Sequence, residues 1–209
     1  EGLHHLIKEI ADNCIDEAIA GFATEVKVFL LPDNGVRVED DGRGIPVDKM
    51  EKTGLSALET VLTVLHAGGK FGGGGYKVSS GLHGVGSSVV NALSTELHAE
   101  VRRQGHVYRQ SYKKGVPDGP IQKGEATDKT GTIITFYPDG TIFKDMEDFS
   151  YEWVVDYLRH QSYLTKGIKT TVIDERTGER QSFYFEGGIQ SYVRHLNIGK
   201  EAVGDKVFY

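Results

Sequence analysis

The sequence predicts an α+β fold, a two-layer α/β sandwich in which a mixed, mostly antiparallel sheet carries helices on one face. Strand-like segments occur in pairs joined by short turns, which favours antiparallel pairing. Helical segments lie between these pairs instead of alternating with single strands, which argues against a doubly wound parallel sheet. The chain has 209 residues, enough for one substantial domain with its own core.

Composition and charge exclude several classes of protein. No apolar run approaches the roughly 20 residues of a membrane-spanning helix, so we expect no membrane association. The single cysteine cannot form an internal disulfide, which favours a cytoplasmic location. The net charge of −6 argues against this segment gripping a DNA backbone by itself. The chain begins at Glu1 instead of Met and enters a helix almost at once, so we expect a piece of a longer protein.

The first half of the chain predicts three helices and a hairpin. Apolar residues repeat at helical spacing before a stop at Gly21: Leu3, Leu6, Ile7, Ile10, Ala11, Cys14, Ile15, Ala18 and Ile19. Residues 26–30 and 36–38 alternate around a turn at 32–35, which predicts a hairpin. Residues 40–52 predict a loop. We expect a second helix at 54–66, and a third at 87–93 with a serine available to cap it.

The second half is mostly strand. Residues 99–101 and 107–108 flank a turn at Gln104-Gly105, and residues 132–137 are β-branched and aromatic. Residues 168–173 and 182–185 flank a turn at Thr177-Gly178. An amphipathic helix around Trp153 precedes the last strand pair, and a final helix starts near Gly188.

One face of the first helix carries polar residues that could perform chemistry. At 100° per residue, His5, Glu9, Asn13 and Asp16 fall within a window of about 80° opposite the apolar stripe. A solvated polar face is the commoner explanation of such a pattern. Alternatively, a carboxylate at Glu9 accepts a proton from water, and the amide oxygen of Asn13 binds a hard cation such as Mg²⁺.

Two glycine-containing runs are the other candidates. Asp40 ends a predicted strand, where its carboxylate can accept a hydrogen bond from an exocyclic amine, and Gly44 lets a flat ring pack on backbone. An acidic turn is the simpler interpretation. Residues 81–87 lead into a helix, which is typical of an anion site, and Lys70 suits a mobile phosphate contact. A dinucleotide fingerprint fails because position 89 is Val.

Taken in order, these motifs resemble one superfamily. Its pattern is Glu9-x3-Asn13, Asp40-x-Gly42-x-Gly44, Gly81-x2-Gly84-x-Gly86 and Gly131-Thr132, as in the Bergerat-fold (GHKL) ATPases. Residues 3–5, 40–46, 63–71, 81–86 and 88–94 are similar to the N-terminal ATPase domain of bacterial type IIA topoisomerases, the family of the DNA gyrase and topoisomerase IV B subunits. The motifs do not separate these two subunits.

The resemblance implies a role for each matching residue, with ATP and Mg²⁺ as cofactors. Glu9 matches the general base that activates water, with His5 as its support, and Asn13 matches the Mg²⁺ ligand. Asp40 matches the adenine-recognising carboxylate, helped by Thr132. The remaining matches are the walls of the adenine pocket and the phosphate-binding lid: Gly44, Ile45, Pro46 and Val61 for the walls, and Lys70, Leu82, His83, Gly84, Val85 and Gly86 for the lid.

Two arginines match the rim of the pocket, where family inhibitors bind. Arg43 is expected to pair with Glu17, and Arg109 matches an arginine that inhibitors contact. Relatives bind aminocoumarin-type and other ATP-site inhibitors, so the resemblance implies an antibiotic target. Two features of the lid depart from the family pattern. Residues 72–75 are all glycine, where many relatives have a more polar stretch, and residue 80 is Ser, where many relatives have Gly.

The resemblance also implies the domain organisation and the partners. We expect an ATP-binding domain at residues 1–187 without its N-terminal arm, and the start of a truncated transducer domain at 188–209. In the longer protein, a second copy, the DNA-cleaving A-type subunit and double-stranded DNA are the expected partners, while this chain is mainly monomeric and hydrolyses ATP slowly. The alternatives are a topoisomerase IV B subunit, or a nucleotide-binding dimerisation module without turnover.

Overall fold

The computed structural model describes residues 2–51, 53–65, 86–144 and 148–198. Within them, nine strands form one sheet in the order β5-β4-β3-β7-β2-β1-β8-β9, with β6 paired to β4. The strands are β1 (Glu25–Leu30), β2 (Val36–Asp40), β3 (Ser94–Arg103), β4 (His106–Lys113), β5 (Val116–Pro117), β6 (Gln122–Ala126), β7 (Gly131–Pro138), β8 (Lys169–Asp174) and β9 (Arg180–Tyr184).

The sheet is mixed and mostly antiparallel, as predicted. β1 and β8 pair in parallel, and every other pair of strands is antiparallel. The parallel pair brings together strands that are more than a hundred residues apart in sequence. The hairpins β1–β2 and β8–β9 therefore lie side by side in the sheet, with β1 next to β8.

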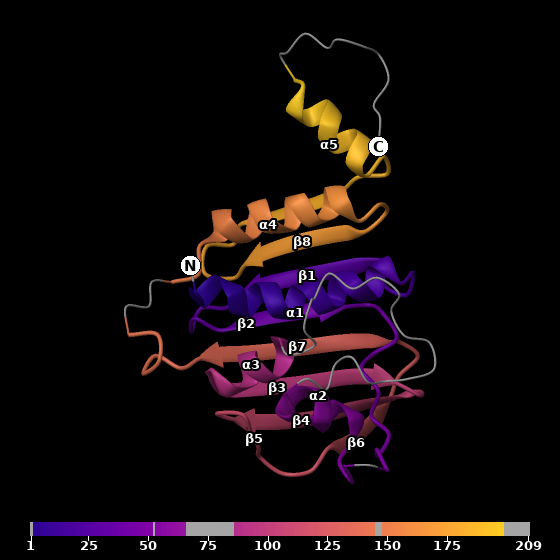
Figure 1. Cartoon of the computed structure of the whole chain (residues 1–209), viewed down its shortest axis with the longest axis vertical. Helices are drawn as coiled ribbons and strands as arrows, with labels where there is room; N and C mark the ends of the chain where they lie inside the picture. Colours follow the sequence, from indigo (N-terminus) through magenta and orange to yellow (C-terminus); the bar gives the residue numbers. More distant parts are fainter. Residues whose placement is uncertain (1, 52, 66–85, 145–147, 199–209) are drawn as a thin grey trace.

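Helices cover one face of the sheet (Figure 1). They are α1 (Gly2–Ile19), α2 (Ala57–Thr63), α3 (Gly86–Ala92) and α4 (Tyr151–Leu164), while α5 (Ile189–Leu196) lies beyond the β9 edge with no buried residue. The apolar stripe of α1 is buried against β1 and β2, as its spacing predicts. None of the described helices is both long and apolar enough to cross a membrane.

Several local expectations are corrected by the structure. The second helix occupies only Ala57–Thr63, because Ser56 caps it and Val64 is already extended. Ser87 lies inside α3 instead of capping it, since that helix begins at Gly86. β5 and β6 were not predicted, because their residues are mostly exposed and show no alternation. Asp16 is only 7% exposed, so it does not belong to the solvated face of α1.

The turns that join the hairpins have the backbone that their sequences predict. Gln104 and Gly105 both adopt positive φ, at 52° and 75°. A two-residue turn in which both residues have positive φ has the twist that an antiparallel pair of strands needs. Here this turn connects β3 to β4. The register of that hairpin decides which arginine reaches the candidate site.

Candidate active site

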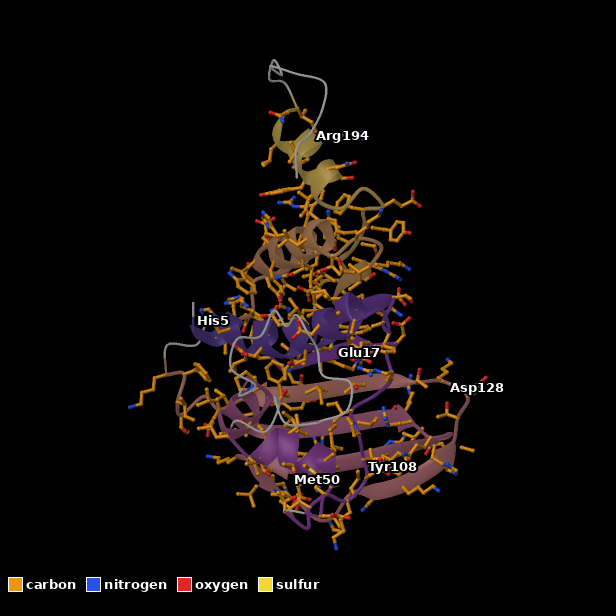
Figure 2. All side chains as sticks on the ribbon, turned by 45° about the vertical axis from the view of Figure 1, so that its right-hand side comes forward. His5, Glu17, Met50, Tyr108, Asp128 and Arg194 are labelled. Atoms are coloured by element: carbon orange, nitrogen blue, oxygen red, sulfur yellow. The ribbon has the colours of Figure 1, made fainter. Side chains whose placement is uncertain are left out.

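The polar side of α1 places three of the predicted residues along one helix. His5 and Asn13 are exposed and Glu9 is partly buried. Figure 2 shows His5 at the N-terminal end of α1 and Glu17 toward its other end, so the candidate residues extend along most of the helix. Within the described residues, His5 makes no hydrogen bond to Glu9, and its supporting role therefore stays a prediction.

Glu9 lies directly against the first residue of α3. A Cβ built on Gly86 would come 2.1 Å from Glu9 Oε2 and 3.0 Å from Glu9 Cβ. No residue with a side chain fits that position without displacing the carboxylate. The glycine at the end of the predicted phosphate-binding turn is therefore also the residue that makes room for the candidate base.

Asn13 of α1 is also held by a residue of α3. Its Nδ2 donates a hydrogen bond of 2.8 Å to Ser87 Oγ, across 74 residues of sequence. Ser87 is only 9% exposed, whereas Asn13 is exposed. The contact gives the two ends of the Asn13 amide different surroundings.

Asp40 ends β2 and lies opposite Thr132 of β7 in the sheet register. Its Oδ1 accepts a hydrogen bond of 2.9 Å from the backbone N–H of Gly42. Burial raises the pKa of Asp40 from 3.8 to about 6, against the opposing effect of hydrogen bonds from Gly42 and from the Cys14 thiol. The carboxylate is thus ionised at neutral pH but partly desolvated, which strengthens any hydrogen bond that it accepts.

The pKa of the Cys14 thiol is also raised, by burial and in part by Asp40. Burial, followed by the negative charge of Asp40, raises its pKa well above its ordinary value. Cys14 therefore stays a neutral thiol beneath the carboxylate. The sequence indicated a small core residue here, and the structure adds its contact with Asp40.

The loop that follows Asp40 packs closely against the neighbouring strands. Gly44 adopts φ +77°, and a Cβ there would approach Arg102 O to 2.9 Å and Val101 Cγ1 to 3.0 Å. The next residue, Ile45, donates its N–H to Thr132 Oγ1 at 3.2 Å. Ile45, Pro46 and Val61 are partly buried, so each keeps some accessible surface. These contacts tie the 42–46 loop to the sheet beside Asp40.

The expected pair of Arg43 and Glu17 is present. Arg43 Nε and NH2 donate to the two carboxylate oxygens of Glu17 at 2.8 and 3.0 Å, and the Arg43 backbone N–H donates to the same carboxylate at 2.9 Å. The guanidinium also lies over the ring of Phe22, 3.5 Å from its centroid. This bidentate, stacked geometry is specific to arginine.

Arg109 is not at this rim, so its predicted place was wrong. It belongs to a charged ladder on the sheet, with Nε 2.9 Å from Glu100 and two further bonds to Glu125. Arg109 lies opposite Glu100 in the register, and Arg103 is an odd number of residues from Glu100. Side chains alternate between faces along a strand, so the two arginines lie on opposite faces of the sheet.

Arg103 is the arginine that the sequence analysis missed. Its NH1 donates to the carbonyls of Arg43 and Gly44 at 3.1 and 2.9 Å. With Arg43 it lines an open hollow whose other walls are Phe22, Gly42, Gln104 and Thr130. Strand alternation from the predicted Gln104-Gly105 turn is the signal that separates Arg103 from Arg109.

The predicted lid residues Lys70, Leu82, His83, Gly84 and Val85 lie outside the described residues. Of the predicted lid, the structure describes Gly86. Within the described part of the chain, no group of three or more His, Cys, Asp or Glu side chains is arranged to hold a metal ion. An Asn amide oxygen is the candidate cation ligand on α1, which suits Mg²⁺ because that ion takes oxygen ligands and retains water and phosphate oxygens.

The arrangement combines a carboxylate packed against a glycine and a hydrogen-bonded amide on α1 with a desolvated carboxylate at the end of β2, the strand on which α1 packs. The family model described as histidine kinase-, DNA gyrase B- and HSP90-like ATPase matches residues 1–142. The chain belongs to this ATPase family, and its fold is the GHKL ATPase fold.

The most informative relatives are DNA gyrase B subunits. That of Staphylococcus aureus is 54% identical over 211 residues, covering 100% of this chain and 33% of the relative. That of Staphylococcus epidermidis is 54% identical over 210 residues, with the same coverage. The chain thus spans about a third of the length of the curated relatives it matches.

A solved structure agrees with this family. The 43K ATPase domain of Thermus thermophilus gyrase B, in complex with an aminocoumarin, has a TM-score of 0.86 and 39% identity. The match covers 99% of this chain and 52% of that one.

Proposed function

We propose that this chain binds Mg-ATP and is the ATP-hydrolysing domain of a gyrase B-type bacterial type II topoisomerase. The observation that carries the proposal is the placement of Glu9 and Asn13 on α1 next to the strand-end Asp40, in a chain that matches gyrase B subunits over its whole length. The Cys14 thiol, one residue after Asn13, contacts Asp40 and so links the two halves of the site.

Each part of the site has a separate task in this proposal. Asp40 accepts a hydrogen bond from the adenine amine, with Thr132 beside it, and Gly44, Ile45 and Pro46 form a surface for the ring. Val61 completes the pocket from α2. Arg43 and Arg103 stand at its mouth, where an aminocoumarin-type inhibitor would bind. Phosphate contacts are assigned to Lys70 and residues 82–86.

Hydrolysis depends on how Glu9 holds water. Phosphoryl transfer is mostly positioning and charge stabilisation, so the base needs only to orient and deprotonate the attacking water. His5 is proposed to support Glu9. Mg²⁺, held through Asn13 Oδ1, would supply neutralisation of phosphate charge.

The longer protein would use this domain as an ATP-driven gate in the cytoplasm. We propose that a second copy, the A-type subunit and double-stranded DNA are its partners, with residues 188–209 starting a transducer domain. The net charge of −6 suits a gate element better than a DNA-cleaving surface. By itself the chain is expected to be mainly monomeric and slow in turnover.

The test is calorimetric titration of a non-hydrolysable ATP analogue with Mg²⁺ into the wild-type chain and into Asp40→Asn. Binding by the wild type with clear loss in the variant supports the adenine site. Equal binding by both would refute the role of Asp40. A parallel Glu9→Ala variant should keep binding but lose turnover by on the order of 100-fold or more, whereas unchanged turnover would leave a binding module without this base.

A further inference from the structure

We propose that Ser87 is a positioning residue that orients the Asn13 carboxamide so that its oxygen faces the bound cation. The inference rests on the proposed function, because it assigns a task to a residue next to the Mg-ATP site. The contact that carries it is the 2.8 Å hydrogen bond from Asn13 Nδ2 to Ser87 Oγ. Ser87 itself touches neither cation nor nucleotide in this proposal.

An asparagine amide needs such a partner because its two ends are nearly the same size and have opposite chemistry. The oxygen can bind a cation, whereas the NH₂ group carries two hydrogens and repels it. A half-turn about the last side-chain torsion exchanges them. Within the described part of the chain, the Asn13 side chain makes this one hydrogen bond, in which its NH₂ group is turned toward Ser87 and its oxygen away from it.

Ser87 is suited to this task because α3 is firmly placed. The first residue, Gly86, packs against Glu9 with no space for a Cβ. Farther along, Val90 and Asn91 are fully buried, and Asn91 Nδ2 donates to Leu62 O at the end of α2 at 2.8 Å. Ser87 Oγ is thus a hydrogen-bonding group in a fixed place, and it anchors the exposed Asn13 side chain.

The geometry also connects the two halves of the mechanism. α3 contacts Glu9 through Gly86 and Asn13 through Ser87, two consecutive residues of one helix turn. Any shift of α3 relative to α1 therefore moves the candidate base and the candidate cation ligand together. Ser87 aligns the amide, and Gly86 leaves space for the carboxylate.

The experiment measures how strongly Mg²⁺ promotes nucleotide binding. A non-hydrolysable ATP analogue is titrated calorimetrically into each chain, with Mg²⁺ and then with EDTA, and the ratio of the two affinities is the readout. We expect Ser87→Ala to lower this ratio roughly tenfold, the lower end of what loss of a ligand-orienting contact costs, and to leave the Mg²⁺-free affinity unchanged.

Three further variants make the test specific. Asn13→Ala should lower the same ratio, and adding Ser87→Ala to it should cause no further fall, because Ser87 acts only through Asn13. Ser94→Ala is the matched control. It removes another buried hydroxyl bonded to α3, Ser94 Oγ to Val90 O at 2.7 Å, and should leave the ratio unchanged.

The outcomes separate this inference from the proposed function. If Asn13→Ala lowers the ratio but Ser87→Ala does not, the inference fails and the Mg-ATP site stands. A Ser87→Ala loss that is equal with and without Mg²⁺, or additive with Asn13→Ala, also overturns it, because Ser87 then acts on packing alone. If the wild-type chain shows no Mg²⁺-dependent binding, the inference and the Mg-ATP proposal fall together.

Discussion

Replacing the strand-end carboxylate by its amide, Asp40→Asn, should stabilise the fold while it removes nucleotide binding. In the fold, burial raises the pKa of Asp40 from 3.8 to about 6. The folded chain therefore holds this proton more tightly than the unfolded chain does, so the free energy of unfolding decreases as the pH rises from about 4 to about 6. Two units of pKa correspond to a cost of about 3 kcal/mol above pH 6.

An asparagine at position 40 avoids this cost and keeps part of the local bonding. Its oxygen can still accept the hydrogen bond from the Gly42 backbone, which measures 2.9 Å in the wild type. The new NH₂ group needs a partner, which returns part of the gain, so we expect a net stabilisation of about 1–3 kcal/mol at pH 7. This should raise the urea midpoint by about 1 M.

The assay is urea unfolding at several pH values, followed by the fluorescence of Trp153, the only tryptophan of the chain. The advantage of Asp40→Asn should be full at pH 7 and vanish near pH 4. Asp139→Asn is the control with the opposite expected effect, because Lys114 and Thr141 lower the pKa of Asp139 to about 2. Asp139→Asn should be less stable than the wild type at pH 7, and this difference in the free energy of unfolding should shrink as the pH falls toward 2. A stability of Asp40→Asn equal to wild type at pH 7, or a difference independent of pH, would refute the reasoning.

Two other perturbations test the packing around α1. Gly86→Ala places a Cβ 2.1 Å from Glu9 Oε2 and should lower single-turnover ATP hydrolysis, measured as phosphate release, by on the order of 100-fold. Gly140→Ala is the control, because a Cβ there meets nothing within 4 Å, and it should keep full activity. Full activity of Gly86→Ala would contradict the placement of the base. Tyr157→Phe removes the hydroxyl that donates to the buried Asp12 at 2.5 Å and should cost about 1–2 kcal/mol in urea unfolding, whereas an unchanged midpoint would mean that Asp12 is satisfied without it.

The elements that the sequence predicted well are those defined by neighbouring residues. The stripe from Leu3 to Ile19, the Gln104-Gly105 turn and the alternation of residues 132–137 each depend on local periodicity or local backbone preference. β5 and β6 lacked such a pattern. They are strands because the exposed edge of β4 offers unpaired backbone groups to them.

In the candidate site, too, some placements could be predicted from the sequence and others required the sheet register. The prediction that Arg43 pairs with Glu17 is confirmed, whereas the predicted place of Arg109 was wrong because residue type alone does not specify which face of a strand a side chain occupies. Arg103 is distinguished by its register in the hairpin. The proposed roles of Asp40 and Asn13 are tested by nucleotide titration, and that of Glu9 is tested by ATP turnover.

By itself, the sequence determined that Glu9 and Asn13 share one side of α1, since residues four apart in a helix always do. It also determined that Asp40 follows a strand and that Gly44 is suited to a positive φ. Only the tertiary structure decided that Gly86 accommodates Glu9, that Ser87 holds Asn13 and that Cys14 lies beneath Asp40. These contacts join segments up to 77 residues apart, and they depend on how α1, α3 and the sheet pack together, which the period of a single element does not specify.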